Sequence, residues 1–355
     1  MDRLDLARGL LDDAGLDALL VGHPANVRYL SGFDGSAGAL LISGSGALLI
    51  TDGRYAAQAS LQAPAFEPFV TALPPSEAAI GLARPGARLG FESDHVAYGT
   101  WERMQRAAHD KGGCLLVPCR GLIEGLRSRK DSHEMALLEK AARIAADALA
   151  SALSLVRPGV AERDVAEEVE RRMKQAGAEG AAFPPIVASG PRAALPHGRA
   201  SERRIEAGDL VVIDIGARFE GYHSDMTRTV CAGRPHQESE QIHAVVREAQ
   251  RRAIDMVRPG VSARDVDAAA REVIAAAGFG DRFTHGTGHG VGLEVHEAPR
   301  LGPRSEDVLD AGMVITIEPG IYLSDRTGVR IEDMVAVTPS GSRTLTPAAA
   351  PWILE

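Results

Sequence analysis

A repeat inside the chain restricts the possible folds more than any other feature of the sequence. Val156-Arg-Pro-Gly-Val160 recurs 101 residues later as Val257-Arg-Pro-Gly-Val261. Each copy is a turn that begins a helix, and each helix is expected to end at Ala-Gly. Ten identical positions in register argue against coincidence, so we expect two halves of similar structure. The identical pairs outside the turns are Arg163/Arg264, Asp164/Asp265, Val165/Val266, Ala176/Ala277 and Gly177/Gly278.

The strand that follows the first copy carries a carboxylate. Leu210 to Ile215 is rich in β-branched and aliphatic residues, which predicts a buried strand, and a returning strand follows after a turn. If that turn is centred on Phe219 and Glu220, Asp214 and Asp225 lie directly opposite each other. Opposed residues share a face, with Cβ atoms about 4.5–5.5 Å apart.

The second copy repeats this arrangement. Ala-Gly precedes both strands, and aligning them places Glu318 at the position equivalent to Asp214. If the second hairpin turns about Asp325, Glu318 lies opposite Glu332. Four carboxylates then converge around a pseudo-two-fold axis, where they would repel one another and resist burial unless a cation lies between them. A bound metal is the simplest answer. The alternative is a solvated edge aspartate and a register shifted by one residue.

Histidines lie near the predicted second hairpin. Residues 284–297 include His285, His289 and His296, with glycines at alternate positions that let the backbone approach a ligand closely. His197 lies in a polar loop before the first hairpin. The glycine pattern is not that of a dinucleotide site, because the third glycine of that motif is missing. A lone histidine is more often a surface or structural residue, but three beside the acid pairs favour a metal site.

Composition excludes several classes of protein. The length of 355 residues suits about two domains. The net charge of -9 argues against nucleic-acid binding. No apolar run approaches the ~20 residues that span a bilayer, and the first residues lack the pattern of a signal peptide. We therefore expect a cytoplasmic protein with no nucleic-acid or membrane partner.

The N-terminal third has a different character. Residues 1–122 alternate short helices and strands, which predicts a small α/β domain without a chemical motif of its own. The charged run Arg127-Ser-Arg-Lys130 is typical of a solvated linker. We place the domain boundary between residues 122 and 123, so that residues 123–355 form the catalytic domain.

These motifs together resemble those of the pita-bread metallopeptidases, which include methionine aminopeptidase, aminopeptidase P and prolidase. The resemblance covers roughly residues 125–350, and residues 1–122 are similar to the N-terminal domain of prolidases and creatinases. It implies an α+β fold: a pita-bread catalytic domain with an internal pseudo-two-fold duplication, preceded by a small α/β domain. The segments most similar to the Xaa-Pro-cleaving branch are Ala188-Ser-Gly-Pro-Arg-Ala-Ala-Leu-Pro-His-Gly198, Gly288-His-Gly-Val-Gly-Leu-Glu-Val-His-Glu297, Ile317-Glu-Pro-Gly320 and Val329-Arg-Ile-Glu-Asp333.

The resemblance also implies a metal site. Its oxygen-rich ligand set suits two divalent ions, Mn, Co or Zn. Asp214 would bind one ion, His289 and Glu318 the other, and Asp225 and Glu332 would bridge them. Glu318 would also accept a proton from the attacking water as general base.

Further roles follow for residues around the metals. His296 would hold the scissile carbonyl, and His197 the side of the leaving proline nitrogen. His285 and Arg330 would line the proline pocket; the alternatives are support of His289 and a salt bridge to a nearby acid. Arg54 is a candidate for binding the free carboxylate of proline, because its fork matches a carboxylate. The alternative is that Arg54 only caps its local helix.

The implied function is hydrolysis of the bond between an N-terminal residue and proline, favouring Xaa-Pro dipeptides. The alternative is an aminopeptidase P that acts on longer Xaa-Pro peptides. A creatinase-like amidinohydrolase needs no metal, and a non-catalytic peptide-binding module would be expected to have lost ligands, so the intact acid set argues against both. We also expect a homodimer in which the N-terminal domain of one subunit caps the site of the other.

Overall fold

The computed structural model describes residues 2–110, 113–347 and 351–354. The chain divides into two compact units, Met1–Arg127 and Ser128–Glu355. The predicted boundary between residues 122 and 123 lies at the start of helix α6, Leu122–Ser128, and stays a prediction. Within the described residues, every helix is too short or too polar to cross a membrane.

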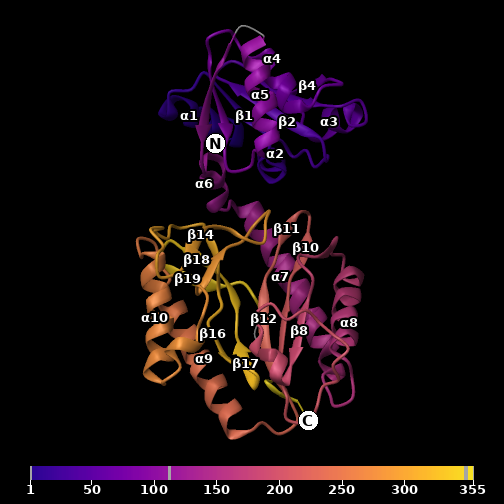
Figure 1. The fold of residues 1–355 in the computed structure, drawn as a ribbon, viewed down its shortest axis with the longest axis vertical. Coiled ribbons are helices and arrows are strands. Elements are labelled where there is room, and N and C mark those ends of the chain that lie inside the picture. Colours follow the sequence, from indigo (N-terminus) through magenta and orange to yellow (C-terminus); the bar gives the residue numbers. More distant parts are fainter. Residues whose placement is uncertain (1, 111–112, 348–350, 355) are drawn as a thin grey trace. The chain divides into compact units, whose positions relative to one another are not determined.

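The N-terminal unit is a small α/β domain, as predicted (Figure 1). Its six-stranded sheet has the order β4-β3-β2-β1-β5-β6, with β1 antiparallel to β2 and parallel to β5. Its elements are α1 (Arg3–Ala14), β1 (Ala18–Val21), α2 (Pro24–Ser31), β2 (Gly38–Ser43), β3 (Ala47–Thr51), α3 (Ala56–Gln62), β4 (Glu67–Val70), α4 (Pro75–Leu82), β5 (Arg88–Glu92), α5 (Tyr98–Asp110) and β6 (Leu115–Cys119).

The first half of the catalytic unit begins with α7, whose N-terminus is fixed by a capping box between Asp131 and Glu134. Two helices precede its strands, and β9 and β12 form the acid-bearing hairpin. The elements are α7 (Ser132–Ala152), η1 (Leu153–Leu155), α8 (Glu162–Gln175), β7 (Gly180–Ala181), β8 (Ile186–Ser189), η2 (Gly190–Ala194), β9 (Leu210–Ile215), β10 (Ala217–Phe219), β11 (Tyr222–His223) and β12 (Met226–Ala232).

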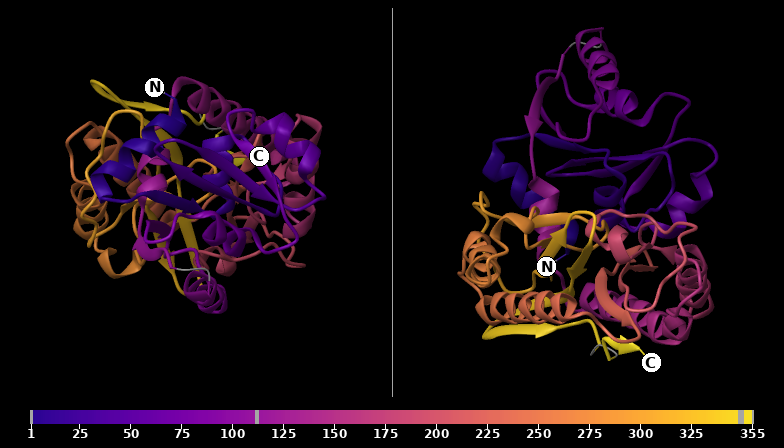
Figure 2. Two further views of the ribbon diagram at one scale, coloured as in Figure 1. Left: turned by 90° about the horizontal axis from the view of Figure 1, so that it is seen from above. Right: turned by 60° about the horizontal axis from the view of Figure 1, so that its bottom comes forward.

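The second half repeats this order, with α9 and α10 preceding another hairpin of strands. Figures 1 and 2 show α9 and α10 on one side of the unit's strands and α8 on the other. The elements are α9 (Gln237–Met256), α10 (Ala263–Ala276), η3 (Gly280–Arg282), β13 (Gly288–Gly290), β14 (Glu297–Leu301), β15 (Val314–Ile317), β16 (Gly320–Leu323), β17 (Thr327–Arg330), β18 (Asp333–Thr338), β19 (Gly341–Thr344) and β20 (Ile353–Leu354).

Backbone geometry supports the equivalence of the two halves. The turn glycines before α8 and α10 both adopt left-handed backbone, with φ of 90° at Gly159 and 83° at Gly260. The glycines before β9 and β15 do the same, with φ of 85° at Gly208 and 89° at Gly312. A residue with a Cβ atom would be strained there, so the repeated glycines reflect a repeated backbone conformation.

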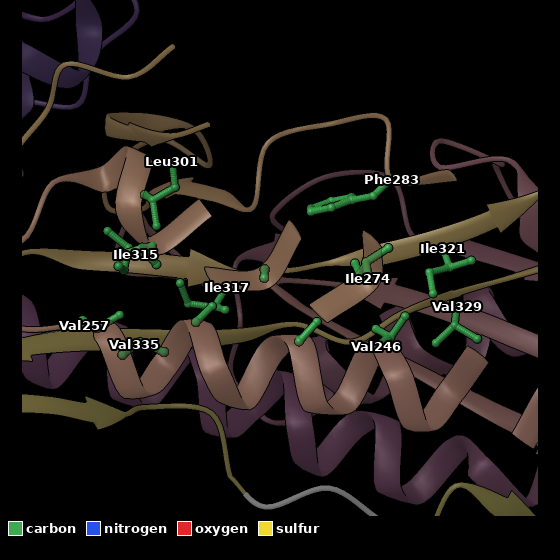
Figure 3. Close-up of a cluster of buried hydrophobic side chains, with 14 of the residues drawn as sticks. Val246, Val257, Ile274, Phe283, Leu301, Ile315, Ile317, Ile321, Val329 and Val335 are labelled. Carbon is green, nitrogen blue, oxygen red and sulfur yellow. The ribbon is translucent and has the colours of Figure 1, made fainter. Parts of the chain in front are cut away.

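Each half has its own apolar core. In the second half, side chains of α9 and α10 pack against those of β15 to β18 (Figure 3). Val246, Ile274 and Ile315 are fully buried there. In the first half, α7 and α8 pack against β8, β9 and β12 around Val165 and Ile213. These cores fix the strands that carry the acids.

Strands and ion pairs also link the two halves. The sheet of the first half has the order β20-β12-β9-β8, so β20 completes it from the far end of the chain. The start of the catalytic unit is in turn bound to the second half. Arg129 forms a β-bridge with Met313, and the Lys130 ammonium pairs with Glu297 at 3.0 Å in a fully buried ion pair.

The predicted register of the second hairpin is confirmed. The predicted register of the first hairpin is wrong, because its turn is centred one residue later than expected. Val314↔Ala336 and Gly320↔Arg330 share one register, which places Glu318 opposite Glu332. In the first hairpin, Asp214 pairs with Thr227 instead of Asp225. The turn is centred on Glu220 and Gly221, both with positive φ, instead of Phe219 and Glu220. This moves the register by two residues, so Asp214 and Asp225 still share a face as diagonal neighbours.

Candidate metal centre

The predicted site residues of the catalytic unit all line one cavity of about 390 Å³. Asp214 lies in β9, whereas Asp225, Glu318 and Glu332 lie in the short connections between strands. The segments before β9 and β14 supply the exposed histidines His197 and His296. The predicted residues on its wall are Asp214, Asp225, His289, Glu318, Glu332, His197, His285, His296 and Arg330.

The proposed ligands come within reach of one another. One ligand atom each of Asp225, His289 and Glu332 lies within 4.8 Å of the other two. His289 Nε2 lies 3.4 Å from Glu318 Oε1 and 3.7 Å from Asp225 Oδ2. Asp214 adds a buried Oδ1 atom that has no hydrogen-bond partner among the described residues. Hard oxygen donors with one imidazole suit divalent ions such as Mn, Co or Zn, so the residues present fit the predicted metals.

Burial makes these acids unfavourable as bare anions. Burial, reinforced by the charges of Glu332 and Asp214, raises the pKa of Asp225 well above its ordinary value. Glu332 has a pKa raised in the same way, by burial and then by Glu318 and Asp214. Burial also raises the pKa of Glu318 to about 7, against the opposing charge of Arg330. A cation among them would favour the charged carboxylates.

His289 is prepared to act as a neutral ligand. Burial lowers its pKa to about 3, so the imidazole is uncharged at neutral pH. Its Nδ1 lies 2.9 Å from the carbonyl oxygen of Gly290, which favours the tautomer with Nε2 free toward Asp225 and Glu318.

Arg330 is a buried partner of the acid cluster. Its guanidinium group donates to Asp214 Oδ2 at 2.6 Å, to the Tyr322 hydroxyl at 2.9 Å and to the Pro196 carbonyl oxygen at 3.1 Å. Its Nε atom donates to Thr227 Oγ1 at 3.1 Å. The salt bridge weighed as an alternative is therefore present. Lining of a proline pocket by Arg330 stays a prediction.

The other histidines occupy different settings. His285 Nε2 lies 2.8 Å from the Tyr322 hydroxyl, and burial lowers its pKa to about 4. His285 is thus bound to Tyr322. Within the described residues it makes no hydrogen bond to His289, which it was expected to support in the alternative role. The exposed His296 lies with its ring centroid 4.3 Å from that of His289. His197 is exposed at the cavity mouth, just after the cavity-lining Pro196.

Sequence reasoning missed two arginines and a tyrosine. Arg199 and Arg300 line the cavity and are exposed. Within the described part of the chain, neither guanidinium group is bound to a carboxylate. The alternating burial of β14 puts Arg300 on the exposed face with Ala298, but this pattern is seen only in the structure, because residues 297–301 do not alternate polar and apolar types. Tyr322, which links His285 to Arg330, likewise had no signal in the sequence.

Arg54 lies in the N-terminal unit, where its guanidinium group binds Asp52. The Nε atom donates to Asp52 Oδ1 at 3.1 Å, and Nη2 donates to Oδ2 at 2.8 Å. The side chain is exposed. The guanidinium group of Arg54 is therefore already paired with Asp52. Its role in binding the carboxylate of a substrate stays a prediction.

A second group of metal-binding residue types lies in the N-terminal unit. His23, His95 and Glu124 have candidate ligand atoms within 4.8 Å of one another. The two imidazole rings are stacked, with centroids 3.8 Å apart and planes 22° apart. The lone pairs of an imidazole lie in its ring plane, so two nearly parallel rings do not point at one ion. This group is better described as a polar cluster around the His95–Glu124 contact at 2.9 Å.

Comparison with known proteins gives a consistent result. The model of metallopeptidase family M24 matches residues 136–339, and that of the creatinase/prolidase N-terminal domain matches residues 3–129. An Xaa-Pro dipeptidase of Pyrococcus horikoshii is 42% identical over 95% of this chain and 94% of its own. The structure of an Xaa-Pro dipeptidase from Bacillus anthracis is 41% identical with a TM-score of 0.95, covering 100% of this chain and 99% of that one. An X-Pro aminopeptidase from Thermotoga maritima is 36% identical with a TM-score of 0.87, covering 96% and 98%.

Proposed function

The chain belongs to metallopeptidase family M24, and from this we propose that it is an Xaa-Pro dipeptidase, which hydrolyses the bond between an N-terminal residue and proline. The observation that carries the proposal is one cavity that holds the full set of four carboxylates and His289 together with three further histidines. Neither a metal-free amidinohydrolase nor a non-catalytic peptide-binding module requires that set.

We propose that Asp214, Asp225, His289, Glu318 and Glu332 hold two divalent ions, of Mn, Co or Zn. When bound, such ions lower the pKa of water and polarise the substrate carbonyl. Asp214 would hold one ion and His289 and Glu318 the other, and Asp225 and Glu332 would serve as ligands shared by the two. The unpartnered Oδ1 of Asp214 supports this assignment.

The protein's own groups then carry the proton transfers. Glu318 accepts a proton from the attacking water as general base. His296 donates to the carbonyl oxygen, where negative charge develops. The amide nitrogen of proline has no hydrogen, so it must gain a proton as the C–N bond breaks. We assign this side of the substrate to His197, which is exposed and lines the cavity.

Recognition of a dipeptide requires a positive group for the free carboxylate of proline. Arg330 is bound to Asp214, and Arg54 is bound to Asp52. Arg300 and Arg199 line the cavity without such a partner, so they take precedence over Arg54 as candidates. A bidentate guanidinium contact would favour a terminal carboxylate over a continuing chain.

The test compares Xaa-Pro with Xaa-Pro-Xaa and with Xaa-Pro amide. Arg300→Ala should weaken binding of Xaa-Pro by about 1.5–3 kcal/mol, the worth of a hydrogen bond to a charged group. It should change binding of the amide much less. Arg199→Ala and Arg54→Ala serve as matched comparisons. If each of the three variants weakened binding of Xaa-Pro and of the amide equally, recognition of the carboxylate by these arginines would be contradicted.

One observation favours a second candidate, an aminopeptidase that acts on longer Xaa-Pro peptides. The X-Pro aminopeptidase from Thermotoga maritima shares nearly the whole fold with this chain. Faster turnover of Xaa-Pro-Xaa than of Xaa-Pro by the purified protein would establish this candidate and exclude the dipeptidase.

We further propose a cytoplasmic homodimer in which the N-terminal domain of one subunit caps the site of the other. The absence of a chemical motif in the N-terminal domain supports this role. Sedimentation at micromolar concentration, with activity measured on the same sample, tests it. A fully active monomer would refute it.

A further inference from the structure

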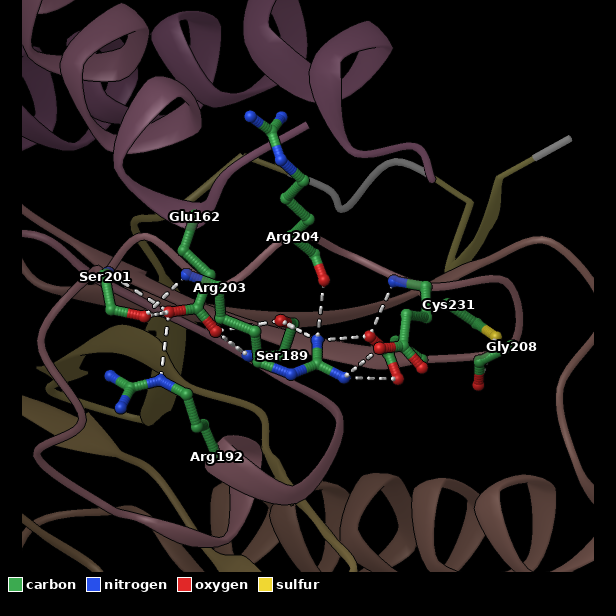
Figure 4. A network of polar contacts seen from close by, with 10 residues as sticks. Glu162, Ser189, Arg192, Ser201, Arg203, Arg204, Gly208 and Cys231 are labelled. Atoms are coloured by element: carbon green, nitrogen blue, oxygen red, sulfur yellow. Dashed lines mark hydrogen bonds and ion pairs between the residues drawn. The ribbon is translucent and has the colours of Figure 1, made fainter. Parts of the chain in front are cut away.

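Glu162 makes far more contacts than the start of a helix requires. It is the first residue of α8 and is completely buried. Its Oε1 atom accepts hydrogen bonds from the amide and the hydroxyl of Ser189, both at 2.8 Å. Its Oε2 atom accepts from Arg192 Nε at 3.0 Å, from the Ser201 amide at 3.1 Å and from the Ser201 hydroxyl at 2.6 Å (Figure 4). Five donors therefore converge on one carboxylate.

Four of the five donors come from the two ends of one loop, and the fifth, Arg192, lies within it. Ser189 ends β8, and Ser201 lies just beyond residue 200. Residues 190–200 between them carry Pro196, His197 and Arg199, which all line the cavity. Glu162 itself is not part of the cavity wall, so its contacts act on the loop from outside.

Other contacts also hold the same loop: a β-bridge joins Ile186 of β8 to Arg199, and Arg192 Nη2 donates to the Arg199 carbonyl oxygen at 2.5 Å. Arg203 donates to Ser189 Oγ and to Asp209 Oδ2, each at 2.6 Å, which extends the network behind the loop. At the tip, Arg330 donates to the Pro196 carbonyl oxygen at 3.1 Å. Glu162 differs from these contacts because its one carboxylate accepts hydrogen bonds from both ends of the loop and from Arg192 within it.

We propose that Glu162 is a positioning residue, which closes the loop of residues 190–200 and thereby holds His197 at the cavity. The inference rests on the proposed function for the role of His197. A buried carboxylate with five donors is geometrically rigid, whereas a loop of this length without closure would sample many conformations. Small displacements of a catalytic group have large effects on rate.

The experiment uses Glu162→Gln, because an amide nitrogen would oppose the donors of one loop end while keeping the side-chain volume. Glu167→Gln is the matched control, since Glu167 lies on the same helix and is exposed. Hydrogen–deuterium exchange should become faster in residues 190–200 and stay unchanged in β9. The exchange pattern of Glu167→Gln should match that of the unmodified protein.

A double-mutant cycle with His197→Ala separates positioning from general stability. In metal-loaded protein with unchanged metal content, Glu162→Gln should lower kcat/KM for Xaa-Pro by about 10- to 100-fold, mainly through kcat. In the His197→Ala background the same change should have little further effect. Ser201→Ala, which leaves the carboxylate in place, should act in the same direction with a smaller loss.

Unchanged exchange in residues 190–200, or equal losses in both backgrounds, would overturn the inference. If Glu162→Gln does not fold, the same two criteria apply to Ser201→Ala. If His197→Ala alone leaves activity unchanged, the role of His197 in the proposed function fails. The exchange measurement still decides whether Glu162 closes the loop, so the two failures are distinguishable.

Discussion

The two acid-bearing hairpins of the catalytic unit perform the same task with different geometry. In the second half, Glu318 lies directly opposite Glu332. In the first half, the common register places Asp225 opposite Gly216. A Cβ atom at Gly216 would lie 1.9 Å from the Ser224 carbonyl oxygen, so the position excludes a second acid. The comparison shows that a shared face, and not direct opposition, is what brings the acids together.

The halves also exchange the groups that satisfy their acids. Arg330 of the second half binds Asp214 of the first at 2.6 Å. Thr227 of the first half donates from Oγ1 to Glu332 Oε2 of the second at 2.7 Å. Asp214 thus has a permanent cationic partner, whereas Glu332 has a neutral one. Glu332 therefore depends more than Asp214 on a bound cation for its charge balance.

The largest effect is expected from removing the proposed bridging acids, one in each half, which should be equally important for metal binding and activity. Asp225→Asn and Glu332→Gln should each abolish activity while the protein stays folded, because each removes a ligand shared by both ions. Turnover, metal content and circular dichroism should be measured together. Retention of two metals per chain with normal turnover in either variant would contradict the ligand assignment.

The second prediction removes the cation that the second half supplies. Arg330→Met should destabilise the protein by about 3–5 kcal/mol, because Asp214 would keep a buried charge without its partner. Added divalent metal should recover part of this loss. Arg326→Met is the control, since its pair with Glu238 is exposed and such pairs contribute about 0–1 kcal/mol. Similar denaturation midpoints for both variants would show that the buried Arg330–Asp214 pair contributes no more to stability than the exposed pair.

The third prediction concerns pH in metal-free protein. The folded-state pKa values of Asp225 and Glu332 are raised, so their contribution to stability is present at low pH and is lost as pH rises through those values. From pH 7 upward most histidines are neutral in both states, so the carboxylates dominate the slope. The pKa of Glu318 is also raised, to about 7, so stability should fall from pH 7 to 8.5, by at most about 1.4 kcal/mol per pH unit and group.

Urea denaturation of chelated protein at both pH values measures this slope. Saturating metal should flatten it, because a cation stabilises the charged carboxylates. Asp225→Asn and Glu332→Gln, one from each half, should reduce the slope about equally. A metal-free protein that is as stable at pH 8.5 as at pH 7 would argue against buried, uncompensated acids.

The smallest effect is expected from the neutral partner. Thr227→Val keeps the side-chain shape but removes the hydrogen bond to Glu332 and the one accepted from Arg330 Nε, so it should cost about 1–3 kcal/mol. Thr229→Val, which removes a bond to the Arg330 carbonyl oxygen, is a matched control on the same strand. A much larger loss of metal affinity for Thr227→Val than for the control would show that Thr227 orients the acid.

The sequence predicted the duplication, the register of the second hairpin and the convergence of the acids, because these depend on local pattern and on the parity of the strands. The first turn was placed one residue early. Glu220, with φ of 46°, adopts the left-handed conformation together with Gly221. A left-handed conformation at a glutamate cannot be predicted from the residue type, so the sequence did not locate the turn correctly. The shift preserved parity, so the acids remained on one face despite the error.

The arginines and Tyr322 could not be placed in the same way. Whether Arg199, Arg300 or Arg330 binds substrate or an internal acid depends on which loops meet at the cavity, and no local pattern records that. The contact of Tyr322 with both His285 and Arg330 likewise joins residues far apart in sequence. Long-range polar contacts are the part of this site that required the structure.

The pairing of β20 with β12 has a consequence for how the molecule is made. The amides of Cys231 and Gly233 are bound by the carbonyl oxygens of Trp352 and Leu354, at 2.6 and 2.8 Å. Until residues 352–354 leave the ribosome, β12 is an open sheet edge, which is a site for mispairing with other chains. Lys130, near the start of the unit, likewise cannot form its buried ion pair until Glu297 has been synthesised. Contacts of such high sequence separation slow folding, so the catalytic unit must assemble after synthesis of nearly its whole length.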